Sequence, residues 1–529
     1  MTEFRKFGPP GTGKTTSLAR DIENAVAKYG EESVLVCSYT KAAATEISGR
    51  VVKIAKHMMG TLHSICFRVL GNPSIAELKF DSFNDEHPQF KLSGDAPEID
   101  DGLDMPNSKT QADNLLWQYQ YYRSRMIPRD GWPNMQVRAF GQAWEGWKER
   151  WGLLDYTDLI DSCLHDVGIV PGDPAVLFVD EAQDLSTMQF ALIRKWGAKC
   201  DFFVMIGDDD QSIYNFAGAD ARNLFTPPLP DEQVKVLHQS FRVPRAVHSI
   251  ATKWIEGCRE RQPKTYNPRD DDGEIAHADK ATYKYPDPLI ADIEGQLAIG
   301  RTCMVIGSCT YMLDPIVRAL REAGIPFHNP YRKAQGAWNP IREGDTSTLA
   351  RFQYFMRTRP DGDYGYTAQI LHLWVDLIQS KGILKHGAKK KIAALAESNP
   401  GLELSTQDLG DFFEPVFFDA TMNGPDPNWL LQNATLSKRE RLTYPYRLWQ
   451  RYGEKVPKPA VTVGTIHSVK GGEADCVYLF PDLSREGALE WQRNPDPVRR
   501  LFYVGMTRAR SRLVLPAALA QPFAVNLSA

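Results

Sequence analysis

A glycine-rich segment near the start of the chain has the pattern of a phosphate-binding loop. Its residues 8–15 satisfy G-x-x-x-x-G-K-[ST]. Glycines let backbone N–H groups point at phosphate oxygens, and the start of a following helix adds a favourable dipole. We expect Lys14 to reach the β- and γ-phosphates of a nucleotide, and the Thr15 hydroxyl to bind Mg²⁺. The predicted nucleotide-binding set is Gly8, Pro9, Pro10, Gly11, Thr12, Gly13, Lys14, Thr15 and Thr16.

Two carboxylates follow a strongly apolar run in the middle of the chain. Residues 176–179 predict a buried strand, and Asp180 and Glu181 come directly after it. Ligands of α/β proteins bind at the carboxyl ends of strands. Acidic residues after a strand are commonly turn or cap residues, but a phosphate loop in the same chain favours a catalytic role. Asp180 would then hold Mg²⁺ through water, and Glu181 would accept a proton from an attacking water molecule.

Strands and helices must hold these groups in place. Residues 4–7 can form a short strand before the loop, and residues 16–28 are typical of a helix after it. A strand, a glycine-rich turn and a helix together distinguish a phosphate loop from a chance match. Further elements expected are strands at 202–207 and 303–307 and a helix at 315–323 that ends at Gly324.

A third strand and loop narrows the choice among nucleotide-binding proteins. Residues 207–219 are G-D-D-D-Q-S-I-Y-N-F-A-G-A, and they resemble motif III of the UvrD/Rep/PcrA-type superfamily-one DNA helicases. Other segments are similar to motifs of that family, in the family's order, so the resemblance spans the chain. They are residues 38–46 (motif Ia), 60–64 (motif Ib), 155–159 (ahead of motif II), 239–242 (motif IV), 463–473 (motif V) and 500–510 (motif VI).

The resemblance implies an α/β fold with two RecA-like P-loop motor domains, in which helices flank parallel sheets. Each motor domain would carry a mainly helical insertion. The first motor domain is expected at 1–65 and 150–238 with its insertion at 66–149, and the second at 239–329 and 456–529 with its insertion at 330–455.

The resemblance also assigns roles to single residues. Gln211 would sense the γ-phosphate, and Arg242 and Arg508 would stabilise its transition-state charge. Phe241 would stack on the adenine, and Glu473 would hydrogen-bond the ribose. The catalytic set is then Glu181, Lys14, Gln211, Arg242 and Arg508. The residues similar to DNA contacts of the family are Tyr39, Thr40, Thr61, His63, Tyr214, Phe216 and His467.

Two basic and aromatic stretches allow more than one interpretation. In 115–151, Arg123, Arg125, Arg138 and Lys148 could line a strand path with the tryptophans, or the tryptophans could fill a helical core. We favour core for Trp144, Trp147 and Trp151. In 438–458, seven basic residues alternate with aromatic ones. Duplex binding and a solvated helix face are equally good interpretations of that pattern.

Composition sets weaker limits. The 529 residues have a net charge of −4, which argues against DNA binding only if charge is pooled over the whole chain. The eight cysteines form no C-x-x-C pair, so we expect buried free thiols, as in cytoplasmic proteins. The first residues are too polar for a signal peptide, and no apolar run is long enough to span a membrane.

The leading interpretation is an ATP- and Mg²⁺-dependent translocase and DNA helicase, moving 3′ to 5′ as the family implies. Its partners would be single-stranded DNA and single-strand/duplex junctions, and the sequence does not identify its protein partners. Two alternatives stay open: a DNA-stimulated ATPase that remodels protein–DNA complexes without processive unwinding, and an ATP-gated regulatory module. The phosphate loop starts at residue 8, without a preceding adenine-reading glutamine, so nucleotide choice is expected to be relaxed.

Overall fold

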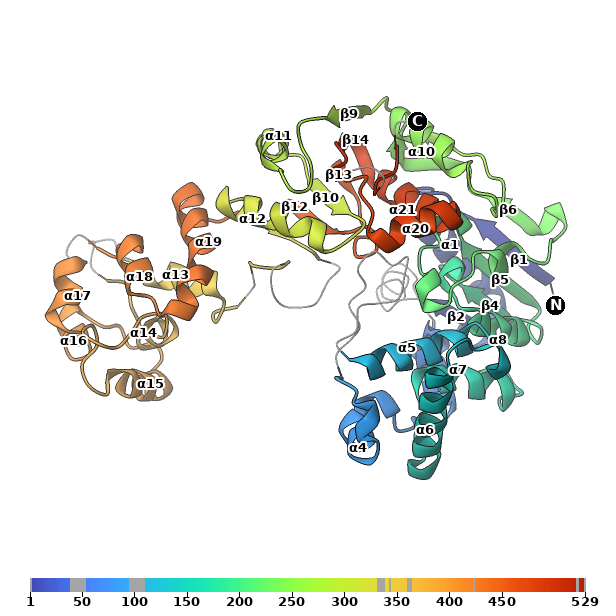
Figure 1. Cartoon of the computed structure of the whole chain (residues 1–529), viewed down its shortest axis with the longest axis horizontal. Helices are drawn as coiled ribbons and strands as arrows, with labels where there is room; N and C mark the ends of the chain where they lie inside the picture. The colour runs from blue at the N-terminus through green and yellow to red at the C-terminus, as the bar shows by residue number, and fades with distance from the viewer. Residues whose placement is uncertain are drawn as a thin grey trace. The chain divides into compact units, whose positions relative to one another are not determined.

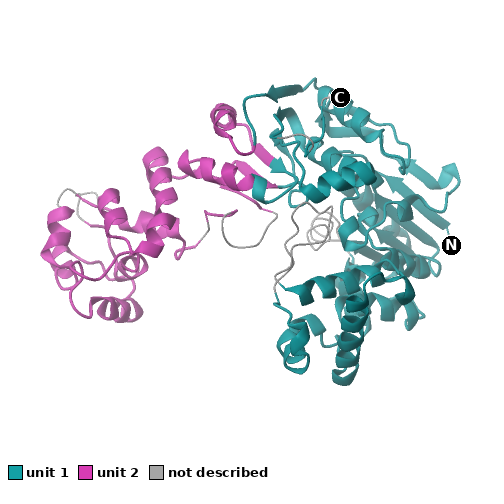
Figure 2. Cartoon of the chain, viewed as in Figure 1, with its two compact units in different colours: residues 1–282, 306–312, 465–529 teal, residues 283–305, 313–464 magenta. Residues whose placement is uncertain are grey.

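The computed structural model divides the chain into two compact units (Figure 2). Unit 1 comprises residues 1–282, 306–312 and 465–529, and unit 2 comprises residues 283–305 and 313–464. The bounds of these two units are not those of the two motor domains and two insertions expected from the sequence. That division into domains stays a prediction. The structure describes residues 2–38, 54–94, 110–330, 338–341, 344–358, 364–421, 424–519 and 523–527.

A six-stranded parallel sheet forms the first part of unit 1, with strand order β3-β2-β4-β5-β1-β6. The labels in Figure 1 show β1, β5, β4 and β2 side by side. The strands predicted at 4–7, 176–179 and 202–207 are confirmed. The strands are β1 (Thr2–Phe7), β2 (Val34–Ser38), β3 (Met59–Thr61), β4 (Val176–Val179), β5 (Phe202–Gly207) and β6 (Val234–Val236).

Both faces of this sheet are buried, which explains why its central strands are apolar throughout. On β4, Leu177 and Val179 join one core cluster, whereas Val176 and Phe178 join another on the opposite face. The first cluster includes residues of three longer helices and of the short helix α9 (Arg222–Phe225), and the second includes residues of one helix. The helices are α3 (Leu62–Val69), α7 (Tyr156–His165) and α8 (Thr187–Gly197) on one face, and α1 (Lys14–Tyr29) on the other.

Parallel pairing brings the candidate chemical groups to one edge of the sheet. Phe7 is in register with Gly207, and Cys37 with Val179. The phosphate loop, Asp180 and the motif III loop therefore all follow strands that end together. The predicted α/β fold with parallel sheets flanked by helices is confirmed.

A small helical core lies in the stretch between β3 and α7. Trp144 and Trp147 are fully buried in it, as predicted, among residues of α4 (Phe80–Glu86), α5 (Gln111–Ser124) and α6 (Met135–Trp151). The prediction that Trp151 is core was wrong, because its side chain is 61% exposed at the last residue of α6. The last turn of α6 has one side in solvent, and the sequence pattern does not show that Trp151 lies on that side.

Two of the basic residues in this stretch are satisfied inside the protein. Arg123 pairs with Asp158 and Asp161, each at 2.7 Å. The Lys148 ammonium is buried and lies 2.5 Å from the Asp155 carboxylate. These cations hold α5 and α6 against α7, so their charges are not available to line a strand path.

The remainder of unit 1 contains two further sets of parallel strands. β7 pairs with β8, and β14 lies between β13 and β9. The strands are β7 (Gln239–Pro244), β8 (Asn267–Arg269), β9 (Glu274–Ala278), β13 (Ala474–Leu479) and β14 (Ala509–Pro516), and the helices are α9 (Arg222–Phe225), α10 (Arg245–Ile255), α20 (Arg485–Arg493) and α21 (Pro495–Met506).

Unit 2 is mainly helical, with an aromatic core that includes Trp374 and Phe413. The strand predicted at 303–307 is β10, and the helix predicted at 315–323 is α12. On α19, Arg451 contacts Glu294 and the Ala323 carbonyl, whereas the role of the basic stretch in duplex binding stays a prediction. The elements that lie wholly or mostly in unit 2 are α11 (Asp287–Ala298), β10 (Cys303–Gly307), α12 (Asp314–Glu322), β11 (Phe327–His328), α13 (Thr348–Phe355), α14 (Ala368–Val375), α15 (Ala388–Ser398), α16 (Thr406–Leu409), α17 (Pro415–Ala420), α18 (Pro427–Asn433), α19 (Leu436–Tyr452) and β12 (Val461–Thr465).

Two sequence expectations concern the chain as a whole. All eight cysteines are free and buried, as predicted. In the described ranges, no helix combines the length and the apolar character needed to cross a membrane.

Trp144→Ala should lower the free energy of unfolding by about 3–5 kcal/mol, because it empties part of a packed core. It also removes the indole N–H that donates to Asp155 Oδ2 at 2.9 Å. Trp151→Ala, on the same helix, should cost less than about 0.5 kcal/mol because that ring is exposed. Urea unfolding followed by circular dichroism measures both variants, and equal losses would contradict this assignment of the core.

Candidate nucleotide-hydrolysis site

The phosphate loop joins β1 to α1. Gly13 has a φ of 74° in the left-handed region, which favours glycine, and α1 begins at the next residue. The Lys14 ammonium folds back over the loop and donates to the Gly8 carbonyl oxygen at 2.8 Å. Lys14 therefore lies on the inner side of the loop, where a bound phosphate would replace the carbonyl as its partner.

Strand β7, which is not part of the first sheet, packs against this loop. On β7, Phe241 N–H donates to the Gly11 carbonyl oxygen and the Ser240 hydroxyl donates to that of Pro10, both at 2.8 Å. Gly11 has a φ of 71°, and a Cβ built there would lie 2.5 Å from the Arg242 Cβ. The Phe241 ring is 69% exposed beside the loop. An open aromatic face next to a phosphate loop suits stacking on a nucleotide base.

Glu181 follows β4 directly, in a backbone conformation that non-glycine residues rarely adopt. Its φ is 51° and its ψ is 40°. Burial raises the pKa of its carboxyl, but the charges of Lys14 and Lys470 and a hydrogen bond from Gln183 outweigh burial, so the pKa lies below its ordinary value. The carboxylate is thus ionised at neutral pH and able to accept a proton.

Gln183 and Asp184 extend this site, although the sequence analysis gave them no role. The Gln183 amide donates to the Glu181 carboxylate and to Asp184 Oδ2, the second bond being 3.3 Å. Lys470 reaches both Asp184 oxygens, at 2.7 and 2.6 Å, and also donates to the Gln211 carbonyl oxygen at 2.9 Å. Burial raises the pKa of Asp184 to about 7 despite this ion pair.

Arg242 and Arg508, from the segments similar to motifs IV and VI, also lie close to the carboxyl edge of the first sheet. The Arg508 guanidinium is 1% exposed and donates to Gln211 Oε1 at 3.1 Å, while Gln211 Nε2 donates to Asp208 Oδ2 at 2.6 Å. Arg242 Nε donates to Glu473 Oε2 at 2.5 Å, and Arg510 contacts the other oxygen of Glu473. All five predicted catalytic residues therefore lie near the phosphate loop and the loops that follow β4 and β5.

The predicted DNA contacts divide into two groups. Tyr214, Phe216 and His467 form an aromatic cluster with ring centroids 5.7–6.1 Å apart. His467 Nε2 donates to the Ile213 carbonyl oxygen at 3.0 Å, and burial lowers its pKa to about 4. The imidazole is therefore neutral, and its hydrogen bond connects the motif V segment to the motif III loop.

The second group lies on and before α3. The Thr61 hydroxyl caps this helix by accepting from Ser64 N–H, and His63 lies in its first turn. Tyr39 and Thr40 lie outside the described residues. Contact of all seven residues with DNA stays a prediction.

Behind the motif III loop lies a buried charge cluster whose cations are not evident from the sequence. The Lys264 ammonium lies 2.5 to 3.2 Å from the carboxylates of Asp208, Asp209 and Asp210. Arg261 adds a two-pronged ion pair to Asp210. Three successive carboxylates after a buried strand were the available signal, because buried charges need partners.

Comparison with known proteins identifies the family. Residues 7–227 match the UvrD/REP helicase N-terminal domain, and residues 460–515 match the UvrD-like helicase C-terminal domain. YjcD of Bacillus subtilis is 22% identical over 96% of this chain and 75% of its own length. The ATP-dependent DNA helicase UvrD1 of Mycobacterium leprae is 24% identical over 96% of this chain and 80% of its own length. The chain belongs to the UvrD/REP helicase family.

One more relative matches half of this chain. The ATP-dependent DNA helicase PcrA of Staphylococcus aureus is 26% identical over 50% of this chain and 40% of its own length. The family resemblance inferred from the motifs is therefore confirmed.

The donors present also fit the Mg²⁺ ion expected of a UvrD/REP site. Asp180 is 2% exposed at the end of β4, and Thr15 lies in the first turn of α1 after β1. β4 and β1 both neighbour β5, so the two oxygen donors follow strands that end at one edge. Mg²⁺ takes few protein oxygens and keeps several waters. Among the described residues, no group of three or more His, Cys, Asp or Glu is arranged to hold a metal ion.

Lys264→Met should lower the free energy of unfolding by about 3–5 kcal/mol at pH 8, because it leaves three buried carboxylates short of a cation. Burial already raises the pKa of Asp209 to about 6, and the Lys264 charge opposes that rise. Without Lys264 the folded pKa rises further above its unfolded value, so stability falls as pH increases through it. The loss should thus be smaller at pH 5.

Urea unfolding at the two pH values measures this difference. Lys253→Met on α10, where the lysine is exposed, is the matched control and should change little at either pH. An equal loss at pH 5 and pH 8 for Lys264→Met would show that the cluster does not act through charge.

Proposed function

We propose that this chain, an ATP-dependent DNA helicase of the UvrD/PcrA type, moves 3′ to 5′ along single-stranded DNA and separates duplex at junctions. One observation carries the proposal. The short motif III loop contains both Gln211, which Arg508 contacts at 3.1 Å, and the aromatic residues Tyr214 and Phe216. A residue positioned to sense hydrolysis and residues suited to stacking on bases thus share one short loop.

The residues at the sheet edge suit ATP hydrolysis. Glu181 is ionised and takes the proton of the attacking water, while Lys14 and Arg508 offset the charge that develops on the γ-phosphate. Gln211 is already held by Asp208, so it is oriented before ATP binds. Thr15 and Asp180 would hold Mg²⁺, which neutralises charge on the β- and γ-phosphates.

Movement along DNA would follow from loss of the γ-phosphate. Arg508 and Lys470 both contact Gln211, through its side chain and its carbonyl oxygen. Lys470 also lies 4.8 Å from the Tyr214 ring centroid. A shift of these two cations would therefore move the loop that carries Tyr214. Separating one base pair costs on average about 1.4 kcal/mol of stacking, so small displacements per ATP suffice.

Glu181→Gln should lower the rate of DNA-stimulated ATP hydrolysis by about 10²–10⁴-fold, because it removes the proton acceptor. ATP binding should persist, since Lys14 and the loop are untouched. Steady-state phosphate release and binding of a fluorescent ATP analogue measure the two effects. Glu256→Gln, at the exposed end of α10, is the control. Normal hydrolysis by Glu181→Gln would rule out this mechanism.

Strand displacement should occur on duplexes with a 3′ single-stranded tail, and not on 5′-tailed or blunt duplexes. The reason is that a 3′-to-5′ motor can run from a 3′ tail into the duplex. A fluorophore–quencher duplex with ATP measures the release of the strand, and Lys14→Ala is the inactive control. DNA-stimulated hydrolysis without strand release from any of these duplexes would favour a remodelling ATPase. ATP binding with no hydrolysis would favour a regulatory module.

A further inference from the structure

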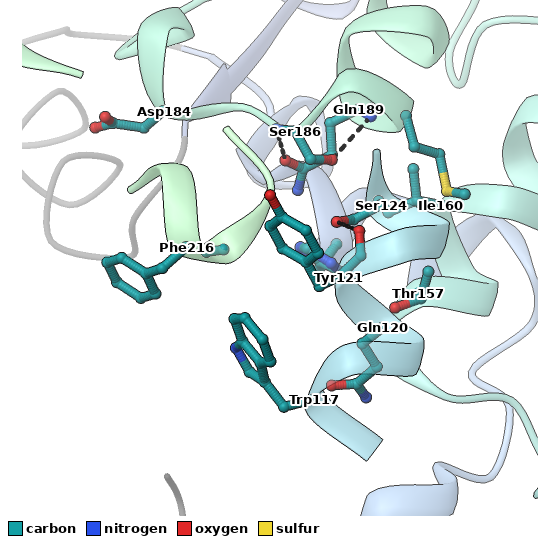
Figure 3. A pocket seen from close by; sticks show the side chains of 13 residues that line it. Trp117, Gln120, Tyr121, Ser124, Thr157, Ile160, Asp184, Ser186, Gln189 and Phe216 are labelled. Carbon is teal, nitrogen blue, oxygen red and sulfur yellow. Dashed lines mark hydrogen bonds between the residues drawn. The ribbon is translucent and has the colours of Figure 1, made fainter. Parts of the chain in front are cut away.

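A cavity of about 260 Å³ opens in unit 1 between α5, α7, the start of α8 and the loop that carries Phe216 (Figure 3). Of the predicted DNA contacts that the structure describes, only His63 and Phe216 line this cavity. Its other walls come from residues to which the sequence analysis gave no role. The largest of these are Trp117 and Tyr121 on α5.

Trp117 and Tyr121 are spaced four residues apart and so lie on one face of their helix. Their rings are stacked, with centroids 5.2 Å apart and planes inclined by 17°. The core of this helical stretch instead takes Leu115, Leu116 and Tyr119 from α5. Figure 3 shows the Trp117 and Tyr121 rings projecting from α5 on the side of the loop that carries Phe216. The stacked pair is therefore a half-buried surface and not part of the core.

The electrostatics of the cavity favour an uncharged ring over a phosphate group. None of the described residues that line it is lysine or arginine. Burial lowers the pKa of His63 to about 4, which leaves its imidazole neutral. The acidic lining residue, Asp184, is already paired with Lys470. Among the described lining residues a phosphate would meet no free cation, whereas a flat base would meet aromatic faces.

Several polar side chains of the cavity wall are already engaged. The Ser124 hydroxyl donates to the Tyr121 carbonyl oxygen at 2.9 Å, and Gln189 Oε1 accepts from Ser186 N–H at 2.8 Å. Gln120 Nε2 donates to Glu77 at 3.0 Å. With these donors and acceptors satisfied, the wall offers stacking more than base-specific hydrogen bonds, which suits any base.

We propose that this cavity receives one base of the bound single strand, with Trp117 and Tyr121 as stacking residues beside Phe216. The proposal rests on the proposed function, because it assumes that a DNA strand passes the motif III loop. It adds α5 to the strand-binding surface and makes the insertion a direct contact with DNA. Phosphates of the strand would stay outside the cavity.

The test compares Trp117→Ala with the wild-type full chain in fluorescence anisotropy. The probes are a labelled oligodeoxythymidylate and the same backbone made of abasic nucleotides. The variant should bind the intact strand about 5- to 150-fold more weakly, because one stacking residue is lost. Its affinity for the abasic strand should match that of the wild type. The salt dependence of binding should also match, since no phosphate contact is removed.

Two further variants separate stacking from a general structural effect. Trp117→Phe should recover most of the preference for the intact strand, because an aromatic face is restored. Trp151→Ala removes a tryptophan from the same helical stretch, outside the cavity, and should leave both affinities unchanged. Equal weakening on intact and abasic strands, or no weakening, would overturn the base-binding proposal. Failure of the wild type to bind either strand, with no DNA stimulation of ATPase, would instead overturn the proposed function itself.

Discussion

Negative charge buried at the carboxyl edge of the first sheet is the constraint on which the rest of unit 1 depends. Glu181, Asp184 and the carboxylates at 208–210 follow neighbouring strands and are held close together by the parallel register. Such groups stay ionised in the interior only if cations reach them. Lys264 and Lys470 supply those cations from parts of the chain well beyond the sheet.

The same cations also connect separate parts of the site. Lys470 pairs with Asp184 and contacts the motif III loop, so the ion pair that permits burial also connects the carboxylates after β4 with the aromatic cluster. Gln183 completes the connection by bonding both Glu181 and Asp184. A change in any one of these partners alters the electrostatic balance felt by the others, which is a physical basis for coupling without a large movement.

The sequence predicted the local features well and the long-range ones poorly. The phosphate loop, the strand before Asp180 and the order of motifs were all recognisable, because each depends on neighbouring residues. The pairing of Lys264 with carboxylates at 208–210 was not, since partners that lie far apart in sequence leave no local pattern. Aromatic residues show a further limit: Trp144 is core, whereas Trp117 and Trp151 are not, and helical spacing alone does not identify the buried face.

Gly11 shows how such a long-range constraint enters a short motif. The phosphate-loop pattern leaves this position open to any residue. In the folded chain, however, β7 passes so close that only a residue without a side chain fits. Any larger residue would clash with β7 and push the loop away from the strand that carries Phe241 and Arg242. The identity of this position is thus dictated by a neighbour more than two hundred residues away, and the nucleotide loop and its covering strand must vary together.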